Sequence, residues 1–223
     1  TWYQALSKED KRKFVNKFRF RVLSNASIAL LGFGFNDIQI AYIGPGFEHY
    51  EGKTVHEIAK ERGMNDLDAY CMLCEESDFA GRVNMGPYST PEIITSLSRH
   101  PNSLYMTDAW VEEHGVQNPA IYDCFPKFLH LSLNGKGDTL PNAIRKMTGA
   151  VAERFSLEHR GLIKPGYYAD LTVFDELALK NGVPDQPKAF GIERVFVNGV
   201  CVLNGETLDE AAFRTAGRAM RVK

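Results

Sequence analysis

The sequence predicts an α/β protein, with helices and strands in alternation followed by a small β unit. Up to about residue 160, segments with helical apolar spacing alternate with short β-branched runs. Strands separated by helices are typical of a parallel sheet or barrel. Further on, two β-branched runs flank Asn198-Gly199, and Asn-Gly in that setting is a strong hairpin signal. We therefore expect a division into residues 1–159 and residues 160–223.

Helices are predicted where apolar residues recur with helical spacing and where end signals bracket them. Thr54 and Glu57 have the spacing of a capping box, and Gly63 would end the same helix. Ser7 and Asp66 are the expected N-caps of two others. The predicted helices are residues 6–20, 54–62, 67–76, 90–99, 124–133 and 139–155.

Strands are predicted where short β-branched or aromatic runs end at Gly, Pro or Asn. The predicted strands are residues 37–43, 82–85, 103–106, 161–163, 170–174, 192–198 and 200–203. Residues 110–122 contain Gly115 and Pro119 and little periodicity, so we expect a loop there.

Composition and charge exclude several classes of partner. The 26 basic and 28 acidic residues give a net charge of −2, and no basic cluster is long enough to follow a phosphate backbone, so no nucleic-acid partner is expected. The longest apolar run is far shorter than a membrane span, so no membrane association is expected. The chain has 4 cysteines, which favours a reducing, cytoplasmic location over a disulfide framework.

Most short motifs in the chain point to structure and not to chemistry. Cys71 and Cys74 have redox spacing, but they share the apolar face of a predicted helix, which favours simple burial. The histidines are scattered, with no His-x-His and no His-Glu-x-x-His, so their spacing does not assemble a metal site.

Asp108 is the strongest candidate for a catalytic group. It comes just after the predicted strand 103–106, where a strand would give way to a loop, and the catalytic groups of α/β barrels lie at the C-terminal ends of strands. An aspartate in that place is also commonly a turn former or a helix cap. His114, on the loop that follows, is the one histidine that we retain as a site candidate, in substrate binding.

Several longer stretches resemble one enzyme family. The runs GLIKPGYYADLTVFDE (161–176) and GIERVFVNGVCVLNGE (191–206) look like the C-terminal signature of the metal-dependent amidohydrolases. Three others resemble the N-acyl-D-amino-acid deacylase (D-aminoacylase) branch: EGKTVHEIAKERG (51–63), CFPKFL (124–129) and AIRKMTGAVAERFSLEHRG (143–161). The resemblance covers most of the chain from about Asp37 onward.

The resemblance implies a fold and a role for Asp108. The fold would be the C-terminal portion of a TIM-like (β/α)8 amidohydrolase barrel, residues 1–159, followed by a small β-sandwich segment, residues 160–223. Thr107-Asp108-Ala109 stands where the family has Ser-Asp-Gly, so Asp108 would contact a zinc ion or its bound water. Zinc lowers the pKa of bound water to about 7, and the carboxylate would pass the water's proton to the leaving amine of a small-molecule amide.

The chain also departs from the family pattern. No residue matches the family's metal-binding histidines, so we expect most zinc ligands to lie outside this chain, in a missing N-terminal half or a complementary chain. The chain alone is then expected to be inactive. Ala120 stands where the family has an arginine for the substrate carboxylate, which weakens the case for an N-acyl-amino acid substrate. The alternative is a non-catalytic relative that acts as a binding or scaffold module.

Overall fold

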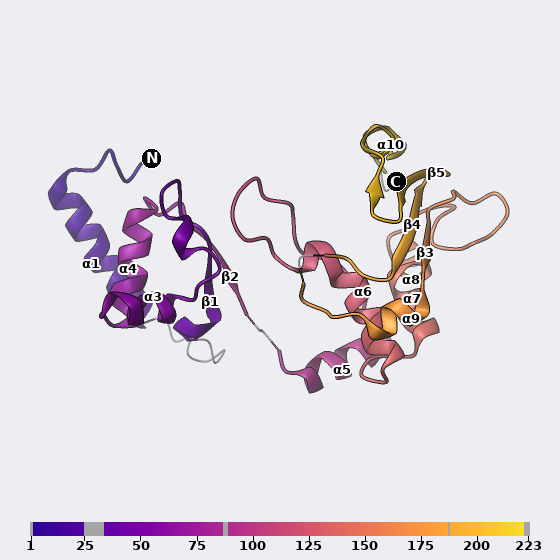
Figure 1. The fold of residues 1–223 in the computed structure, drawn as a ribbon, viewed down its shortest axis with the longest axis horizontal. Coiled ribbons are helices and arrows are strands. Elements are labelled where there is room, and N and C mark those ends of the chain that lie inside the picture. Colours follow the sequence, from indigo (N-terminus) through magenta and orange to yellow (C-terminus); the bar gives the residue numbers. More distant parts are fainter. Residues whose placement is uncertain (1, 25–33, 87–88, 187, 221–223) are drawn as a thin grey trace. The chain divides into compact units, whose positions relative to one another are not determined.

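The computed structural model describes residues 2–24, 34–86, 89–186 and 188–220 of the chain (Figure 1). The chain divides into two compact units, and the boundary is not a single point in the sequence. The first unit consists of Thr1–Thr90 and Val111–Asn118, and the second of Pro91–Trp110 and Pro119–Lys223. Among the described residues, no helix is both long and apolar enough to span a membrane.

The first unit packs helices against a two-stranded antiparallel sheet. Strand β1 (Ile38–Tyr42) pairs with β2 (Arg82–Met85), with Ile38 opposite Met85 and Gln39 opposite Asn84. Its helices are α1 (Lys8–Ser24), α3 (Val55–Arg62) and α4 (Asp66–Glu76), with short 3-10 turns η1 (Phe35–Asp37) and η2 (Glu48–Tyr50). The predicted helices and strands of this unit are therefore confirmed.

Local side-chain caps fix the ends of these helices. Thr54 and Glu57 form the expected capping box of α3, and Gly63 ends that helix with a φ of 65°. The hydroxyl of Ser7 accepts a hydrogen bond from the Asp10 amide. The cap of α4 is Asn65, whose side chain accepts from the Asp68 amide, and the expectation of Asp66 is wrong.

The core of the first unit lies between β1, α3 and α4. Ile40, Val55, Ile58 and Ala69 are almost fully buried there. Val55 and Ile58 lie three residues apart and therefore on one face of α3, because every third or fourth residue of a helix points the same way.

The second unit combines helices with a four-stranded antiparallel sheet in the order β3-β4-β5-β6. Its helices are α5 (Pro91–Arg99), α6 (Ala120–Leu133), α7 (Leu140–Met147), α8 (Gly149–Arg154), α9 (Glu176–Asn181) and α10 (Glu210–Ala216). Its strands are β3 (Leu171–Phe174), β4 (Ile192–Val197), β5 (Val200–Asn204) and β6 (Thr207–Leu208). Leu129, Ala143 and Leu179 form its apolar core between α6, α7 and α9.

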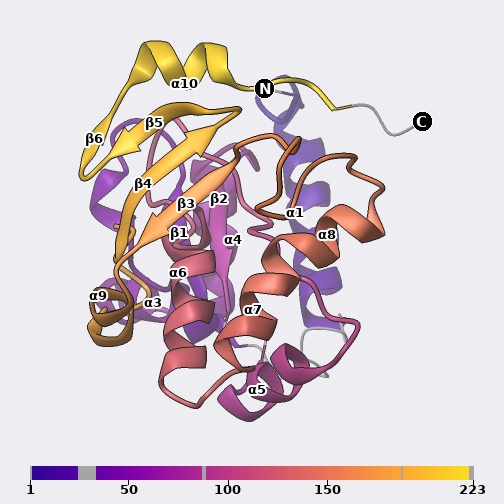
Figure 2. The ribbon, with the colours of Figure 1, turned by 90° about the vertical axis from the view of Figure 1, so that its right-hand side faces the viewer.

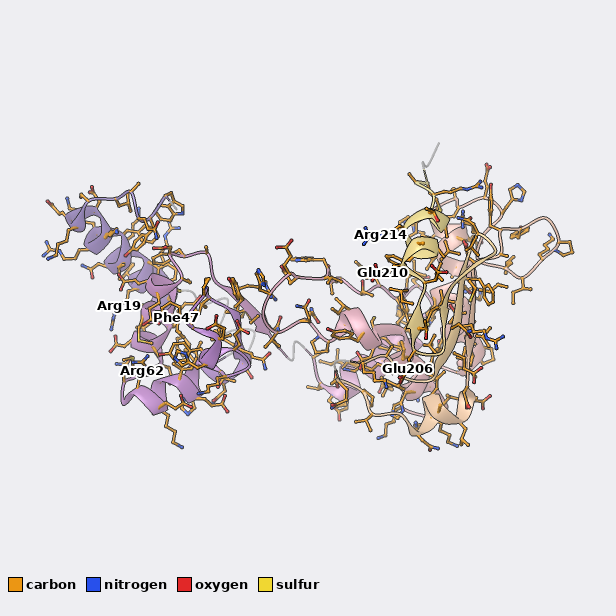
Figure 3. All side chains as sticks on the ribbon, turned by 45° about the horizontal axis from the view of Figure 1, so that its top comes forward. Arg19, Phe47, Arg62, Glu206, Glu210 and Arg214 are labelled. Atoms are coloured by element: carbon orange, nitrogen blue, oxygen red, sulfur yellow. The ribbon has the colours of Figure 1, made fainter. Side chains whose placement is uncertain are left out.

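The hairpin between β4 and β5 turns at the predicted Asn198-Gly199. Both residues have positive φ, 49° and 85°, as a two-residue turn of this kind requires. Figure 2 shows α10 running along the sheet, and its Glu210 and Arg214 lie one turn apart in an exposed ion pair of 3.6 Å (Figure 3).

Two predicted strands are wrong. Ser103–Met106 pairs with no strand among the described residues, and a run of β-branched and aromatic residues forms a strand only when a partner edge accepts its backbone hydrogen bonds. Residues 161–163 form no strand: Gly161 lies in a bend with a φ of 78° and packs so close to α8 that a Cβ would lie 2.6 Å from the Cβ of Ala152.

Two helix boundaries also differ from the prediction. The helix expected over 139–155 is broken at Thr148, whose backbone leaves the helical region, so α7 and α8 are separate. Helix α6 begins at Ala120, four residues before the predicted start, which shortens the expected loop. The described residues contain both helices and strands, so the mixed α/β class is confirmed. Both of their sheets are antiparallel, and the parallel barrel stays a prediction.

Candidate active site

Asp108 lies in the second unit, on an irregular segment that follows α5. Its side chain is exposed, and its backbone has a φ of 47°. A positive φ is uncommon for a residue other than glycine, although aspartate tolerates it better than most. Because the side chain is exposed, the orientation of the carboxylate depends on how the preceding backbone is held.

A buried lysine holds the start of that segment. The ammonium group of Lys146, on α7, donates to the backbone oxygens of Ser98 at 2.6 Å and His100 at 2.8 Å. Lys146 is only 4% exposed. Both carbonyls belong to the C-terminal end of α5 and the turn after it, where backbone oxygens lack partners within the helix. Lys146 thus caps α5 from a neighbouring helix.

Asp138 balances the charge of this lysine. Its Oδ2 atom lies 2.7 Å from the Lys146 ammonium, and its Oδ1 accepts from the Thr139 amide at 2.7 Å. Burial alone would raise the pKa of Asp138, but its hydrogen bonds, that of Lys146 first and then those of Thr139 and Asn142, lower it below its usual value. Asp138 is therefore a buried carboxylate that pairs with the Lys146 ammonium inside the unit.

The later part of the segment rests on α6. The ring of Tyr105 lies 4.5 Å from that of Phe128, and the thiol of Cys124 donates to the backbone oxygen of Met106 at 3.1 Å. Cys124 is buried, and burial, with the neighbouring charge of Asp123, raises the pKa of its thiol. The group is therefore a neutral thiol, which can act as a donor.

His114 lies in the first unit, on a loop held against β1 and β2. Its ring is exposed and lies 5.6 Å from the ring of Tyr42, at an interplanar angle of 31°. Its backbone oxygen accepts from the Arg82 guanidinium at 2.6 Å, and the same guanidinium pairs with Glu112 at 3.3 Å. The loop fits closely, because a Cβ added at Gly115 would collide with the backbone of β1.

Asp108 and His114 are thus fixed by different units, and each has its own set of supporting contacts. Sequence reasoning missed those supports, which are Lys146, Cys124 and Arg82. One signal could have revealed Lys146. It lies three residues after the buried Ala143, on the apolar stripe of its helix, where a lysine must find buried acceptors.

The donor set for a zinc ion is incomplete within the described part of the chain. No group of three or more His, Cys, Asp or Glu side chains comes together among the described residues. Zinc sites use three or four protein ligands, so Asp108 alone does not suffice. These residues therefore do not by themselves fit the metal that the resemblance implies.

The Cys71 and Cys74 pair is structural, as the sequence indicated. Both thiols are free and lie on α4. Burial, with the charge of Cys71 adding to it, raises the pKa of Cys74 to about 12, and burial also raises the pKa of Cys71. Reactive cysteines have lowered pKa values, so the raised values of this pair agree with a structural role.

Comparison with known proteins agrees with the resemblance seen in the sequence. Residues 106–203 match the sequence model of the amidohydrolase family. A D-aminoacylase of Alcaligenes xylosoxydans xylosoxydans is 31% identical over 160 residues, which are 70% of this chain and 32% of that protein. An N-acyl-D-aspartate deacylase of the same organism is 42% identical over 167 residues, 72% of this chain and 32% of that protein.

Solved structures show the same relationship. A crystal structure of D-aminoacylase, described as defining a novel subset of amidohydrolases, superposes with a TM-score of 0.63 at 29% identity, over 78% of this chain and 36% of that one. An N-acyl-D-glutamate deacylase from Bordetella bronchiseptica, solved with zinc and a phosphonate inhibitor, superposes with a TM-score of 0.62 at 25% identity, over 75% of this chain and 35% of that one.

The chain spans about a third of the length of these curated relatives. The matched family region begins two residues before Asp108 and ends within β5, so it includes α6, α7 and most of the second unit. Over the part that these matches cover, the chain is similar to the amidohydrolase family and to the D-aminoacylases.

Proposed function

We propose that the protein containing this chain is a zinc-dependent amidohydrolase that hydrolyses non-peptide C–N amide bonds, of the N-acyl-D-amino-acid deacylase type. The observation that carries the proposal is the family match over residues 106–203, which includes Asp108. The names of both curated relatives, a D-aminoacylase and an N-acyl-D-aspartate deacylase, support the reaction class. The chain is proposed to be the C-terminal portion, with barrel units in residues 1–159 and a β-sandwich segment in residues 160–223.

In this proposal Asp108 is the general acid and base, and it also contacts the metal. An exposed carboxylate can take a proton from the water molecule that attacks the amide carbonyl. The carboxylic acid so formed then gives the proton to the leaving amine, because an amide anion is too poor a leaving group. The exposure of Asp108 is consistent with this role.

Substrate binding is assigned to His114, whose exposed ring is supported by Tyr42 and by the Arg82 clamp. The substrate is a small-molecule amide. Ala120 is the first residue of α6 and carries no charge, so it cannot hold a substrate carboxylate. Selectivity for a substrate with a free carboxylate therefore requires another cation.

Zinc is the proposed cofactor, and its remaining ligands are proposed to lie outside this chain. The incomplete donor set among the described residues supports this, as does the share of the relatives that the chain spans. The partner is then the rest of the amidohydrolase, either as an N-terminal half or as a complementary chain. We propose a cytoplasmic location, which the four free cysteines favour.

The alternative is a non-catalytic relative that serves as a binding or scaffold module. Thr107 and Ala109 favour it, because they stand where the resembling family has serine and glycine beside the aspartate. Ala120 favours it as well, since it removes a substrate contact.

The replacement Asp108→Asn in the full-length protein separates the two functions. Loss of a general acid and base lowers turnover by about 10²-fold or more while the fold stays intact. Asp185→Asn is the matched control, because Asp185 is also exposed and also has a positive φ, 63°. Turnover near the wild-type value in Asp108→Asn removes that residue from the mechanism, and absence of amidase activity in the full-length wild type favours the scaffold.

A further inference from the structure

Two buried donors on neighbouring helices bond the backbone of the segment that leads to Asp108. Lys146 on α7 holds its beginning, at Ser98 and His100, and Cys124 on α6 holds its end, at Met106. We propose that Lys146 and Cys124 are positioning residues for Asp108. This inference rests on the proposed function, because it assumes that the carboxylate of Asp108 acts on the substrate.

The Lys146 ammonium is held by a full set of hydrogen bonds. It has three protons and three acceptors, at 2.6, 2.7 and 2.8 Å, two of them backbone oxygens at the end of α5 and the start of the segment. A buried ammonium is tolerated only when it is paired and hydrogen-bonded, and Asp138 supplies the opposite charge. Since all three protons are used, the ammonium group has one orientation. The two backbone carbonyls that accept its hydrogen bonds are held in place with it.

Cys124 fixes the other end of the segment. Its thiol bonds the Met106 oxygen, two residues before Asp108, from the first turns of α6. Between the two anchors, the hydroxyl of Ser103 donates to the His100 oxygen at 2.8 Å, and Tyr105 packs on Phe128. The segment thus contacts α7 at its beginning and α6 at its end, and it does not form a strand.

Figure 2 shows these two helices side by side, with α5 at the foot of α7. They are neighbours in the fold and share the apolar core of the unit, which contains Leu129 from α6 and Ala143 from α7. The anchors therefore stand on a common rigid support.

The consequence for Asp108 follows from its own geometry. Its side chain is exposed and its φ is 47°, so the direction of the carboxylate depends on the backbone that leads to it. A displacement of about 1 Å in a reacting group costs on the order of 10²-fold in rate. Loosening either anchor should therefore lower kcat and leave the affinity for substrate almost unchanged.

The test uses the full-length, metal-loaded protein and an N-acyl-amino acid substrate. One variant combines Lys146→Met with Asp138→Asn, so that no buried charge is left unpaired. The second pair is Cys124→Ala, which removes the donor, and Cys124→Ser, which keeps one. Lys127→Met is the control, because Lys127 is also on α6 but pairs with the exposed Asp185.

We expect kcat to fall by roughly 10- to 100-fold in the Lys146/Asp138 variant and in Cys124→Ala, with KM within about twofold of wild type. Cys124→Ser should recover most of the loss, and Lys127→Met should match wild type. Amide hydrogen exchange of residues 103–108 should become faster in the two damaged variants, and this readout is independent of activity.

The same substitutions in an Asp108→Asn background decide whether the anchors act through Asp108. If they do, they cause no further loss there. Losses that multiply in that background overturn the proposal, as do unchanged kcat values or an increase in KM alone. If the Lys146 variant does not fold, the two Cys124 variants decide between these outcomes. Normal turnover in Asp108→Asn alone overturns the proposed role of Asp108 and, with it, the positioning role of Lys146 and Cys124. Faster amide exchange at residues 103–108 would still show that the two donors hold this backbone.

Discussion

Replacing Lys146 alone by methionine measures how much the buried ion pair contributes to folding. The substitution keeps the length and the burial of the side chain but leaves the carboxylate of Asp138 without its cation. Lys146 and Asp138 are 4% and 9% exposed, so solvent cannot replace the missing charge. Breaking such a pair from one side costs about 3–5 kcal/mol of unfolding free energy.

The double variant Lys146→Met with Asp138→Asn separates the charge from the hydrogen bonds. It leaves no buried charge, and its main loss is the donor to the oxygens of Ser98 and His100. That loss costs roughly 1–3 kcal/mol, so the double variant should be more stable than Lys146→Met alone. If the losses from the two single substitutions simply added, the double variant would instead be the less stable of the two.

The difference between wild type and Lys146→Met should also depend on pH. The pKa of Asp138 lies below its usual value when the protein is folded. A lowered carboxyl pKa stabilises the fold above the pKa of the unfolded chain, about 3.9, and this contribution disappears as the pH falls through the folded value. The penalty of Lys146→Met is therefore largest at neutral pH and shrinks below about pH 4.

Urea unfolding of the 223-residue chain, followed by circular dichroism at pH 7 and at pH 3.5, measures these differences, with Lys127→Met as the control at a half-buried lysine that pairs with the exposed Asp185. A cost below about 1 kcal/mol for Lys146→Met at pH 7 would refute the buried-pair argument, because exposed pairs contribute that little. A double variant less stable than the single one would refute it as well.

Three further predictions concern the site and its surroundings. The 223-residue chain, purified alone, should contain no stoichiometric zinc by elemental analysis and show no amidase activity, because the described residues bring no three ligands together. The full-length protein should discriminate little in kcat/KM between an N-acyl-amino acid and its carboxamide, since Ala120 offers no charge; a strong preference for the carboxylate reveals another cation. A thiol reagent at pH 8 should label Cys74 far more slowly than an unfolded control, because the pKa of that thiol is raised to about 12.

Local signals predicted the elements that depend on local contacts. The Thr54 and Glu57 capping box, the Gly63 end of α3 and the Asn198-Gly199 turn are each set by residues within a few positions of one another. Elements that depend on distant partners were not predictable in the same way. Residues 103–106 have the composition of a strand, but a strand also needs a neighbouring edge.

The candidate residues were found by type and order, whereas their supports were not. Asp108 and His114 are conspicuous because aspartate and histidine carry chemistry and lie on a loop. Lys146, by contrast, is a charged residue on the apolar face of its helix. The carbonyls that accept its hydrogen bonds lie 46 and 48 residues away in the chain. Any residue supplies a carbonyl, so the sequence contains no sign of which ones a buried lysine will meet.

Both anchors lie in stretches that carried the family resemblance, CFPKFL for Cys124 and AIRKMTG for Lys146. Neither stretch contains a residue that we assign to the reaction. The structure gives them a physical task, which is to hold from two helices the backbone that enters Asp108. On our proposal, a chain that kept the aspartate but lost these donors would still present a carboxylate without controlling its direction. Recognition of such a site therefore depends on the buried donors as much as on the exposed acid.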